Sequence, residues 1–257
     1  PLWLLKYLPN MLACHIGILH DIQGPSNTIT CAEAASSLAI AEASDIISRG
    51  NADVAVTGGA ESKANPILML RQILNKRTVS SYNDNPESAC RPFDADADGS
   101  VFGEAAGILV LEDSEAAQSR GAAVYAQIAG TGHSTSLNRD LTGMEEDGKA
   151  LQIAVESALS EAGISAAELD LIVPHGTGIP TDDLAEARAL EKVLPEGADT
   201  PVWPIKSMIS NTGAASSAVD VIAAVCAMRD SFIPAARNCE KTAEGCSLNI
   251  NKNPVSK

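Results

Sequence analysis

The chain has 257 residues, 45% of them hydrophobic, which is enough to bury the core of one large domain or of two moderate ones. It contains no apolar run of about 18 residues and no signal-peptide pattern at its start, so we expect no membrane span and a cytoplasmic location. The formal net charge of −15 argues against nucleic acid as a partner, because phosphate binding requires clustered Lys and Arg.

The cysteines and the basic residues suggest no special chemistry. The six cysteines show neither a CxxC pair nor the spacing of a disulfide framework, so we interpret them as reduced thiols. The one local basic cluster, formed by Arg71, Lys76 and Arg77, is typical of a solvated face, with a docking patch as the alternative.

The sequence also lacks a pattern of metal ligands. The acidic run from Asp94 to Asp98 imitates a calcium loop, but Ala105 stands where the bidentate Glu is required. His15 and His20 lie in a mixed apolar stretch without further ligands, so we interpret them as packing or surface residues. We therefore predict neither a metal nor a cofactor.

Hydrophobic periodicity and turn residues divide the chain into alternating strands and helices. The expected strands are the runs 27–30, 53–57, 108–111, 123–129 and 170–174. The expected helices are 32–49, 67–74, 114–120, 151–162, a helix with a threonine cap after Gly178, and a buried helix at 214–228. A polar loop is expected at 130–147. The order strand, helix, strand occurs before 112 and again after 121, which indicates an α/β protein.

The stretch from Gly24 to Ala43 predicts a strand, a sharp turn and a buried helix. Gly24-Pro25 is a turn pair, and from Ala32 the chain is Ala-rich with almost no charge until Asp45. A turn of this kind presents its side chain to a cleft, where the free N–H groups of the new helix favour negative charge. The residue at the turn is therefore the first candidate for a functional group.

Two further segments carry candidate functional side chains. The buried run 170–174 leads directly to His175-Gly176-Thr177-Gly178, and a His in this position lies more plausibly in a cleft than in a core. The segment from Lys206 to Asn211 precedes the apolar helix expected at 214–228.

Together these segments resemble the β-ketoacyl-acyl-carrier-protein synthases, the thiolase-fold condensing enzymes of fatty-acid and polyketide synthesis. The resemblance rests on the elbow at 24–43, on Gly58-Gly59-Ala60-Glu61, on Arg91-Pro92-Phe93-Asp94, and on the segments at 175–180 and 206–211. It implies an α/β, thiolase-like fold of two similar halves of mixed sheet layered with helices (α-β-α-β-α). Residues 1–115 would be the remainder of the N-terminal half and residues 116–257 most of the C-terminal half, incomplete at both termini.

The resemblance also places the family's nucleophile. Counting forward from Gly24, and backward from the landmark at 58–61, puts the family's catalytic Cys at Glu33 and not at Cys31. A carboxylate cannot replace the thiol, because its attack on a thioester gives a mixed anhydride that is open to hydrolysis.

The other site residues follow from the same resemblance. His175 matches one catalytic His of the family, and Asn211 replaces the other. Lys206 matches a retained Lys, and Glu186 falls on the family's internal carboxylate. We expect Lys206 and Glu186 to form a buried pair beside the site, with a purely structural Lys206 as the alternative.

Three functions stay open. The first is a non-condensing homologue, similar to the chain-length factor that pairs with a working synthase. The second is a malonyl-carrier decarboxylase in which His175 and Asn211 donate to the thioester oxygen, opposed by the charge of Glu33. The third is an active 3-oxoacyl-carrier-protein synthase whose nucleophile has shifted to Cys31. The resemblance implies as partners the acyl carrier protein, an acyl or malonyl thioester, and a homodimer or a heterodimer with an intact synthase.

Overall fold

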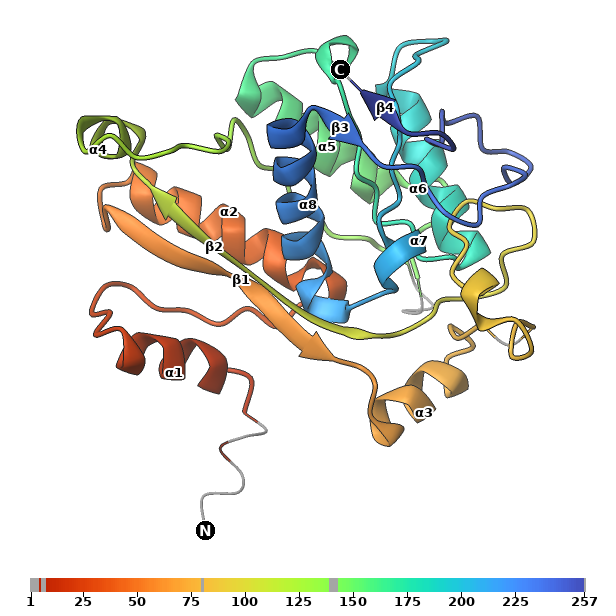
Figure 1. Cartoon of the computed structure of the whole chain (residues 1–257), viewed down its shortest axis with the longest axis horizontal. Coiled ribbons are helices and arrows are strands. Elements are labelled where there is room, and N and C mark those ends of the chain that lie inside the picture. The colour runs from red at the N-terminus through yellow and green to blue at the C-terminus, as the bar shows by residue number, and fades with distance from the viewer. Residues whose placement is uncertain (1–4, 6–7, 80, 139–142, 257) are drawn as a thin grey trace.

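The structure is a computed structural model that describes residues 5, 8–79, 81–138 and 143–256. Its helices are α1 (Met11–Leu19), α2 (Ala35–Ser48), α3 (Pro66–Leu74), α4 (Ser114–Ser119), α5 (Lys149–Ala162), α6 (Pro180–Val193), α7 (Lys206–Ile209) and α8 (Ser216–Asp230). Its strands are β1 (Val54–Ser62), β2 (Glu104–Glu112), β3 (Phe232–Ile233) and β4 (Val255–Ser256). Short 3₁₀ turns are η2 (Ala32–Ala34), η3 (Pro86–Ser88), η4 (Ala166–Glu168) and η5 (Gly213–Ala215). The α2 and α8 helices lie against a long two-stranded ribbon, and α5 and α6 lie beyond α8 (Figure 1).

The ribbon is the antiparallel pair β1–β2, whose register runs from Val54 opposite Glu112 to Ser62 opposite Glu104. Near its middle, Gly59 permits an unusually close approach of two helices. A Cβ atom at Gly59 would lie 2.5 Å from the carbonyl oxygen of Ala214 and 2.8 Å from Cβ of Ser36. Glycine is therefore needed for α2 and the segment that leads into α8 to start on the same face of β1.

The starts of α2 and α8 are joined directly. The backbone N–H of Ala218 donates to Oγ of Ser36 at 3.0 Å, and Oγ of Ser217 donates to the carbonyl oxygen of Glu33 at 3.2 Å. Each helix is preceded by a 3₁₀ turn, and the two turns, η2 and η5, are in contact. This contact brings the elbow at Glu33 next to the segment that follows Asn211.

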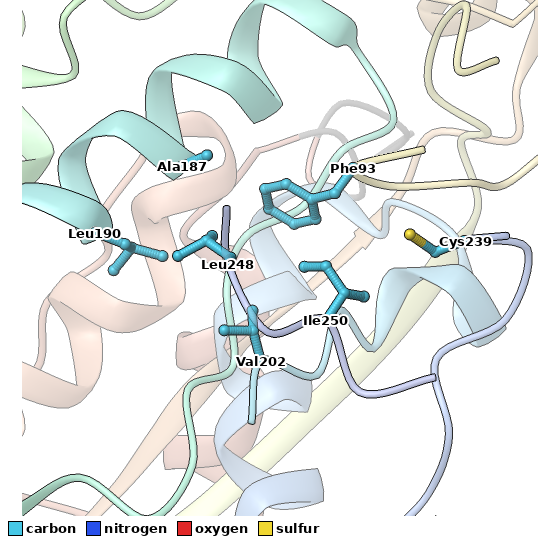
Figure 2. Packing of buried hydrophobic residues seen from close by; sticks show 7 residues of the cluster. All are labelled: Phe93, Ala187, Leu190, Val202, Cys239, Leu248 and Ile250. Atoms are coloured by element: carbon cyan, nitrogen blue, oxygen red, sulfur yellow. The ribbon is translucent and has the colours of Figure 1, made fainter. Parts of the chain in front are cut away.

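A hydrophobic core holds the second half of the chain together (Figure 2). Ala187 and Leu190 of α6 pack there against residues that are far apart in the sequence. These are Phe93, Val202, Cys239, Leu248 and Ile250. In a second cluster, Trp203 and Ile205, which follow Val202, pack with Ile233 and with Ala227 of α8. The segment 202–205 is thus held between α6 and α8, which fixes the position of Lys206 immediately after it.

The expected helices are all present, and they end within a few residues of the predicted positions. Two details of the prediction are wrong. The N-cap of α6 is Ile179, which makes no side-chain cap, so no threonine caps this helix. The helix expected to be buried all round is α8, but Met228 is 62% exposed there, so apolar composition alone overestimated its burial.

Two of the expected strands are confirmed and three are wrong. β1 and β2 contain 53–57 (from Val54) and 108–111, but no strand is formed by 27–30, 123–129 or 170–174 among the described residues. These segments find other neighbours. Just after the run 123–129, Gly132 approaches the α5 backbone so closely that a Cβ atom would lie 1.9 Å from the oxygen of Ala154, and within the run 170–174 Ile172 makes an isolated bridge to Val202. A strand needs a partner strand, which the alternation of apolar residues does not supply.

The expected polar loop at 130–147 is irregular where it is described, and residues 139–142 lie outside the described part. Residues 1–4, 6 and 7 lie outside it as well. Within the described residues, no helix combines the length and the apolar character that crossing a membrane requires.

Candidate active site

The chain turns sharply just before α2, as the sequence predicts. Ala32 has a φ of 45°, a left-handed conformation that residues other than glycine seldom adopt. Glu33 follows in η2, and its Oε1 accepts a hydrogen bond from Nζ of Lys63 at 2.8 Å. Cys31 precedes the turn and is exposed. At the elbow the side chain held by a neighbour is therefore a carboxylate and not a thiol.

Glu33 is ionised at neutral pH. Burial by itself would raise the pKa of Glu33, but the hydrogen bond and the charge of Lys63, with a further contribution from His175, lower that pKa to about 2. The side chain of Lys63 is only 7% exposed and that of Glu33 is 23% exposed. Removal of either partner would leave a poorly solvated charge, so the two side chains depend on each other.

The loop that carries His175 is held by two carboxylates of α6. Four consecutive backbone N–H groups, those of residues 175–178, donate to them: the first two to Glu186 at 2.7 and 2.8 Å, the last two to Asp183 at 2.7 and 3.0 Å. The carboxylates are three residues apart and so share one face of the helix. Burial raises the pKa of Glu186 to about 7 and that of Asp183 to about 6, although these hydrogen bonds oppose the rise. α6 thereby fixes the backbone of His175.

His175 is neutral at neutral pH. Burial lowers its pKa, and nearby cations add to this effect, so that the pKa is about 3. The cations are Lys206, Arg77 and Lys63, whereas Glu33 acts in the opposite direction. The structure thus brings Glu33 and Lys206 within electrostatic reach of His175. A neutral imidazole carries one N–H donor and one acceptor nitrogen.

Asn211 presents a hydrogen-bond donor that is not used. The residue is 1% exposed, and its backbone N–H donates to the oxygen of Val101 at 2.8 Å while its carbonyl accepts from Gly103 at 2.9 Å. Its Oδ1 accepts from the N–H of Gly213 at 3.0 Å, which sets the orientation of the amide. Nδ2 is buried without a hydrogen-bond partner among the described residues. Leaving such a group unpaired costs about 1–3 kcal/mol, so Nδ2 is suited to a ligand acceptor.

Lys206 is buried, but the partner predicted for it is wrong. Its Nζ donates to Oδ2 of Asp220 in α8 at 2.8 Å, whereas Glu186 is occupied by the backbone of residues 175 and 176. Burial raises the pKa of Asp220, and the charge and hydrogen bond of Lys206 oppose this rise. Sequence pattern cannot choose between two buried acids, because the choice depends on how α6 and α8 lie relative to α7.

Sequence reasoning missed Lys63, Asp183 and Asp220. Each had a signal that in retrospect is visible: Lys63 is the only Lys between residues 6 and 76 and follows an apolar strand, and Asp220 is a lone charge inside an apolar helix. Asp183 stands three residues before Glu186 on the same helix. A single charged residue in an apolar setting needs a partner. Its presence therefore indicates a buried ion pair or a set of hydrogen bonds to the backbone.

The remaining charged candidates have separate partners. Arg77 pairs with Asp182 at 2.8 Å, so Arg71, Lys76 and Arg77 do not form one exposed patch. In the acidic run, Asp94 accepts from Arg91 at 2.9 Å and Asp98 accepts from the backbone N–H of Ser81 at 2.9 Å. The side chains of Asp94 and Asp98 are thus engaged in local structure.

Three features define the class of the protein as a thiolase-like α/β fold. The elbow at Glu33 opens α2, the loop of His175 is hydrogen-bonded to α6, and the segment of Lys206 precedes α8. The N-terminal domain of the β-ketoacyl synthases matches residues 2–117, and their C-terminal domain matches residues 125–240. The chain belongs to the β-ketoacyl synthase family. The division between residues 115 and 116 stays a prediction.

Relatives and solved structures agree with this assignment. The chain is 37% identical over 251 residues to the 3-oxoacyl-[acyl-carrier-protein] synthase 2 of Rhizobium meliloti (strain 1021), over 97% of this chain and 59% of that protein. It superposes with a TM-score of 0.92 and 27% identity on a chain of a type II polyketide acyl carrier protein in complex with its ketosynthase, over 96% of this chain and 61% of that one. It superposes with a TM-score of 0.86 and 30% identity on the ishigamide ketosynthase/chain length factor, over 97% and 59%. The predicted thiolase-like fold is confirmed, and the chain spans less than two thirds of each of these proteins.

Proposed function

We propose that this chain is a non-condensing member of the β-ketoacyl synthase family that acts in fatty-acid or polyketide biosynthesis as the partner of a synthase with an intact thiol, as a chain-length factor does. The observation that carries the proposal is the carboxylate of Glu33 at the elbow, held by Lys63 at 2.8 Å. The likeness to a ketosynthase/chain length factor supports it.

The chemistry of the carboxylate supports a loss of condensing activity. Condensation requires a nucleophile that takes the acyl group as a thioester of similar energy, and only a thiolate does so near neutral pH. The pairing that lowers the pKa of Glu33 to about 2 also lowers the basicity of its oxygens, and with it their nucleophilicity. Acyl transfer to Glu33 is therefore disfavoured both by the energy of the product and by the low nucleophilicity of the carboxylate.

A shifted nucleophile at Cys31 is less well supported. Cys31 lies on the far side of the left-handed turn at Ala32, and its side chain is exposed. Lys63, the cation that contacts the elbow, is paired with the carboxylate of Glu33.

The proposal is tested by co-expression of the full-length protein with an intact synthase from the same gene neighbourhood. We expect a heterodimer by size-exclusion chromatography with light scattering. After incubation with radiolabelled acyl carrier protein and denaturation, the label should be found on the synthase alone. A Cys31→Ser variant should behave like the parent. Label on this chain that disappears in Cys31→Ser would show an active synthase, and a failure to associate with the synthase would contradict the partner role.

A second function, decarboxylation of a malonyl thioester on the carrier protein, is favoured by one observation. Among the described residues, Nδ2 of Asn211 is a buried donor without a partner, and the neutral imidazole of His175, which lies within electrostatic reach of Glu33 and Lys63, is a second donor. Such donors stabilise the negative charge that develops on a thioester oxygen. Lys63 moreover offsets the charge of Glu33, which weakens the repulsion of a malonyl carboxylate. The C–C bond would break to release carbon dioxide, and the enolate would take up a proton to give the acetyl thioester.

This second function is tested by the release of carbon dioxide from malonyl carrier protein. Asn211→Ala should lower the rate about 10²–10³-fold, the usual effect of losing one oxyanion donor. Asn51→Ala, at an exposed position, is the matched control and should leave the rate unchanged. Equal rates in the parent and in Asn211→Ala would exclude Asn211 from this role.

A further inference from the structure

Lys63 is a buried cation immediately after β1, and the site is built to hold it. Its Nζ lies 2.8 Å from Oε1 of Glu33 and 5.3 Å from the centre of the Phe102 ring, within the range of a cation–π contact. With 7% of its side chain exposed, the ammonium group is stabilised by these contacts in place of water. Lys63 is thus held at a defined position and is not a mobile surface lysine.

The backbone ties Lys63 to the segment of Asn211. The N–H of Lys63 donates to the oxygen of Gly103 at 3.1 Å, and the N–H of Gly103 donates to the oxygen of Asn211 at 2.9 Å. Gly103 therefore joins the backbones of Lys63 and Asn211 through hydrogen bonds, which fixes the position of the Lys63 cation relative to Asn211. A shift of Lys63 would be felt at both Glu33 and Asn211.

The charges around His175 are almost all neutralised by partners other than the imidazole. Lys206 pairs with Asp220 and Arg77 with Asp182. Glu186 and Asp183 accept the backbone N–H groups of residues 175–178. Of the acids, Glu33 acts most strongly on His175, and its carboxylate is paired with the side chain of Lys63. Loss of Lys63 would leave Glu33 free to pair with a protonated His175.

We propose that Lys63 is a positioning residue: by holding the carboxylate of Glu33, it prevents a Glu33–His175 ion pair and keeps His175 as a neutral hydrogen-bond donor. The inference deepens the second of the proposed functions and rests on it, because there the site contacts a thioester through neutral donors. Its test does not depend on that function, since it measures protonation and not association or turnover.

The experiment is an NMR titration of the histidine Cε1–H resonances in the full chain, with His175 assigned through a His175→Asn variant. The exposed His15, His20 and His133 serve as internal references. In Lys63→Met we expect the titration midpoint of His175 to rise by one pH unit or more, a tenfold gain in proton affinity. Lys63→Arg should keep the parent midpoint, and Lys149→Met, at an exposed position, should do so as well.

A double-mutant cycle separates positioning from a direct effect of the Lys63 charge on His175. If Lys63 acts through Glu33, the shift caused by Lys63→Met should be at least threefold smaller, in proton affinity, in the presence of Glu33→Gln. Equal shifts with and without Glu33→Gln would overturn the proposal, as would an unchanged midpoint in a folded Lys63→Met protein. If Lys63→Met does not fold, Lys63→Leu, which also removes both the charge and the donor to Glu33, takes its place in the same cycle and is held to the same outcomes.

Discussion

The backbone of Ser210, the residue before Asn211, has φ 68° and ψ 179°. This region is populated almost only by glycine, and other residues pay about 1–3 kcal/mol to adopt it. The neighbouring N–H groups are fully used, since Ser210 donates to the oxygen of Lys206 at 2.9 Å and Asn211 donates to Val101 at 2.8 Å. The surrounding hydrogen bonds therefore hold a strained residue in place directly before a candidate site residue.

We expect Ser210→Gly to raise the free energy of unfolding by about 1 kcal/mol. The relief of strain exceeds the entropic cost of a glycine, which is about 0.5–1 kcal/mol. Chemical denaturation measures the change. Ser231→Gly is the control, because Ser231 has φ 49° and ψ 40°, an ordinary left-handed conformation with less strain to relieve. A Ser210→Gly protein less stable than its parent would show that the strain is not stored at this residue.

The pH dependence of stability should reveal the neutral state of His175. Its pKa is lowered from 6.5 to about 3 in the folded chain, so between these values the unfolded chain takes up the proton and the folded chain does not. The stability contributed by His175 is therefore complete above pH 6.5 and is lost as the pH falls. The raised pKa values of Glu186 and Asp183 act in the opposite direction, stabilising the fold as the pH falls through about 7 and about 6.

A comparison with His175→Asn isolates the histidine from the two acids. Between about pH 7 and about pH 5, the parent should lose up to about 2 kcal/mol of unfolding free energy relative to the variant. Urea unfolding at both pH values measures this difference. A difference that stays constant with pH would mean that His175 titrates normally in the folded chain.

At the scale of single residues, the sequence indicates which side chains are candidates for the site better than it indicates which side chains they pair with. His175 could be picked out because it directly follows a buried run, whereas Glu33 and Asn211 were placed by the resemblance to the family's motifs. The partner of Glu33 lies 30 residues away and that of Lys206 lies 14 residues away, in other elements. Which charges meet is decided by tertiary packing, and for that reason the predicted Lys206–Glu186 pair was wrong and Lys63 was missed.

At the scale of elements, α6 acts as a clamp on the loop 175–178. Glu186 receives two backbone N–H groups, one on each carboxylate oxygen. Glu186→Gln would turn an amide N–H₂ toward one of these donors, leaving it unpaired, at a cost of about 1–3 kcal/mol. We therefore expect a loss of unfolding free energy of this size, and a changed chemical shift of the His175 imidazole because its backbone moves.

The matched control for the clamp is Glu156→Gln on the exposed face of α5, where Glu156 accepts from the side chain of Gln152. Its effect should stay within about 0.5 kcal/mol, as is usual for surface substitutions. If Glu186→Gln were equally mild, the backbone of His175 would have to be fixed by the packing around it and not by α6.

Helices were more predictable than strands because a helix satisfies its own backbone. The periodicity of 151–162 and the glycine at 163 suffice to define α5 and its end. The run 123–129 alternates as a strand should, yet the following segment lies along α5, with Gly132 against Ala154. Within the part of the chain that the structure describes, the long strands are β1 and β2, which pair with each other, and the register of that pair joins residues about 50 positions apart.

The charge of the whole molecule sets the conditions for the proposed carrier partner. The chain carries a formal charge of −15, and acyl carrier protein is itself acidic. Exposed basic side chains near α3 are reduced to Arg71 and Lys76, since Arg77 is paired with Asp182. Two acidic proteins repel each other over a distance that salt shortens, from about 30 Å at 0.01 M to about 10 Å at 0.1 M.

We therefore expect the affinity for acyl carrier protein to increase several-fold as the ionic strength rises from about 0.01 M to about 0.1 M, because screening removes long-range repulsion while short-range contacts persist. Isothermal titration calorimetry with the full-length protein measures this dependence. The double variant Arg71→Gln, Lys76→Asn should change the affinity little if the net charge dominates. An affinity that falls as salt is added, and that is lower in the double variant than in the parent, would instead assign docking to Arg71 and Lys76 beside α3. Attraction between complementary charges is the interaction that added salt weakens.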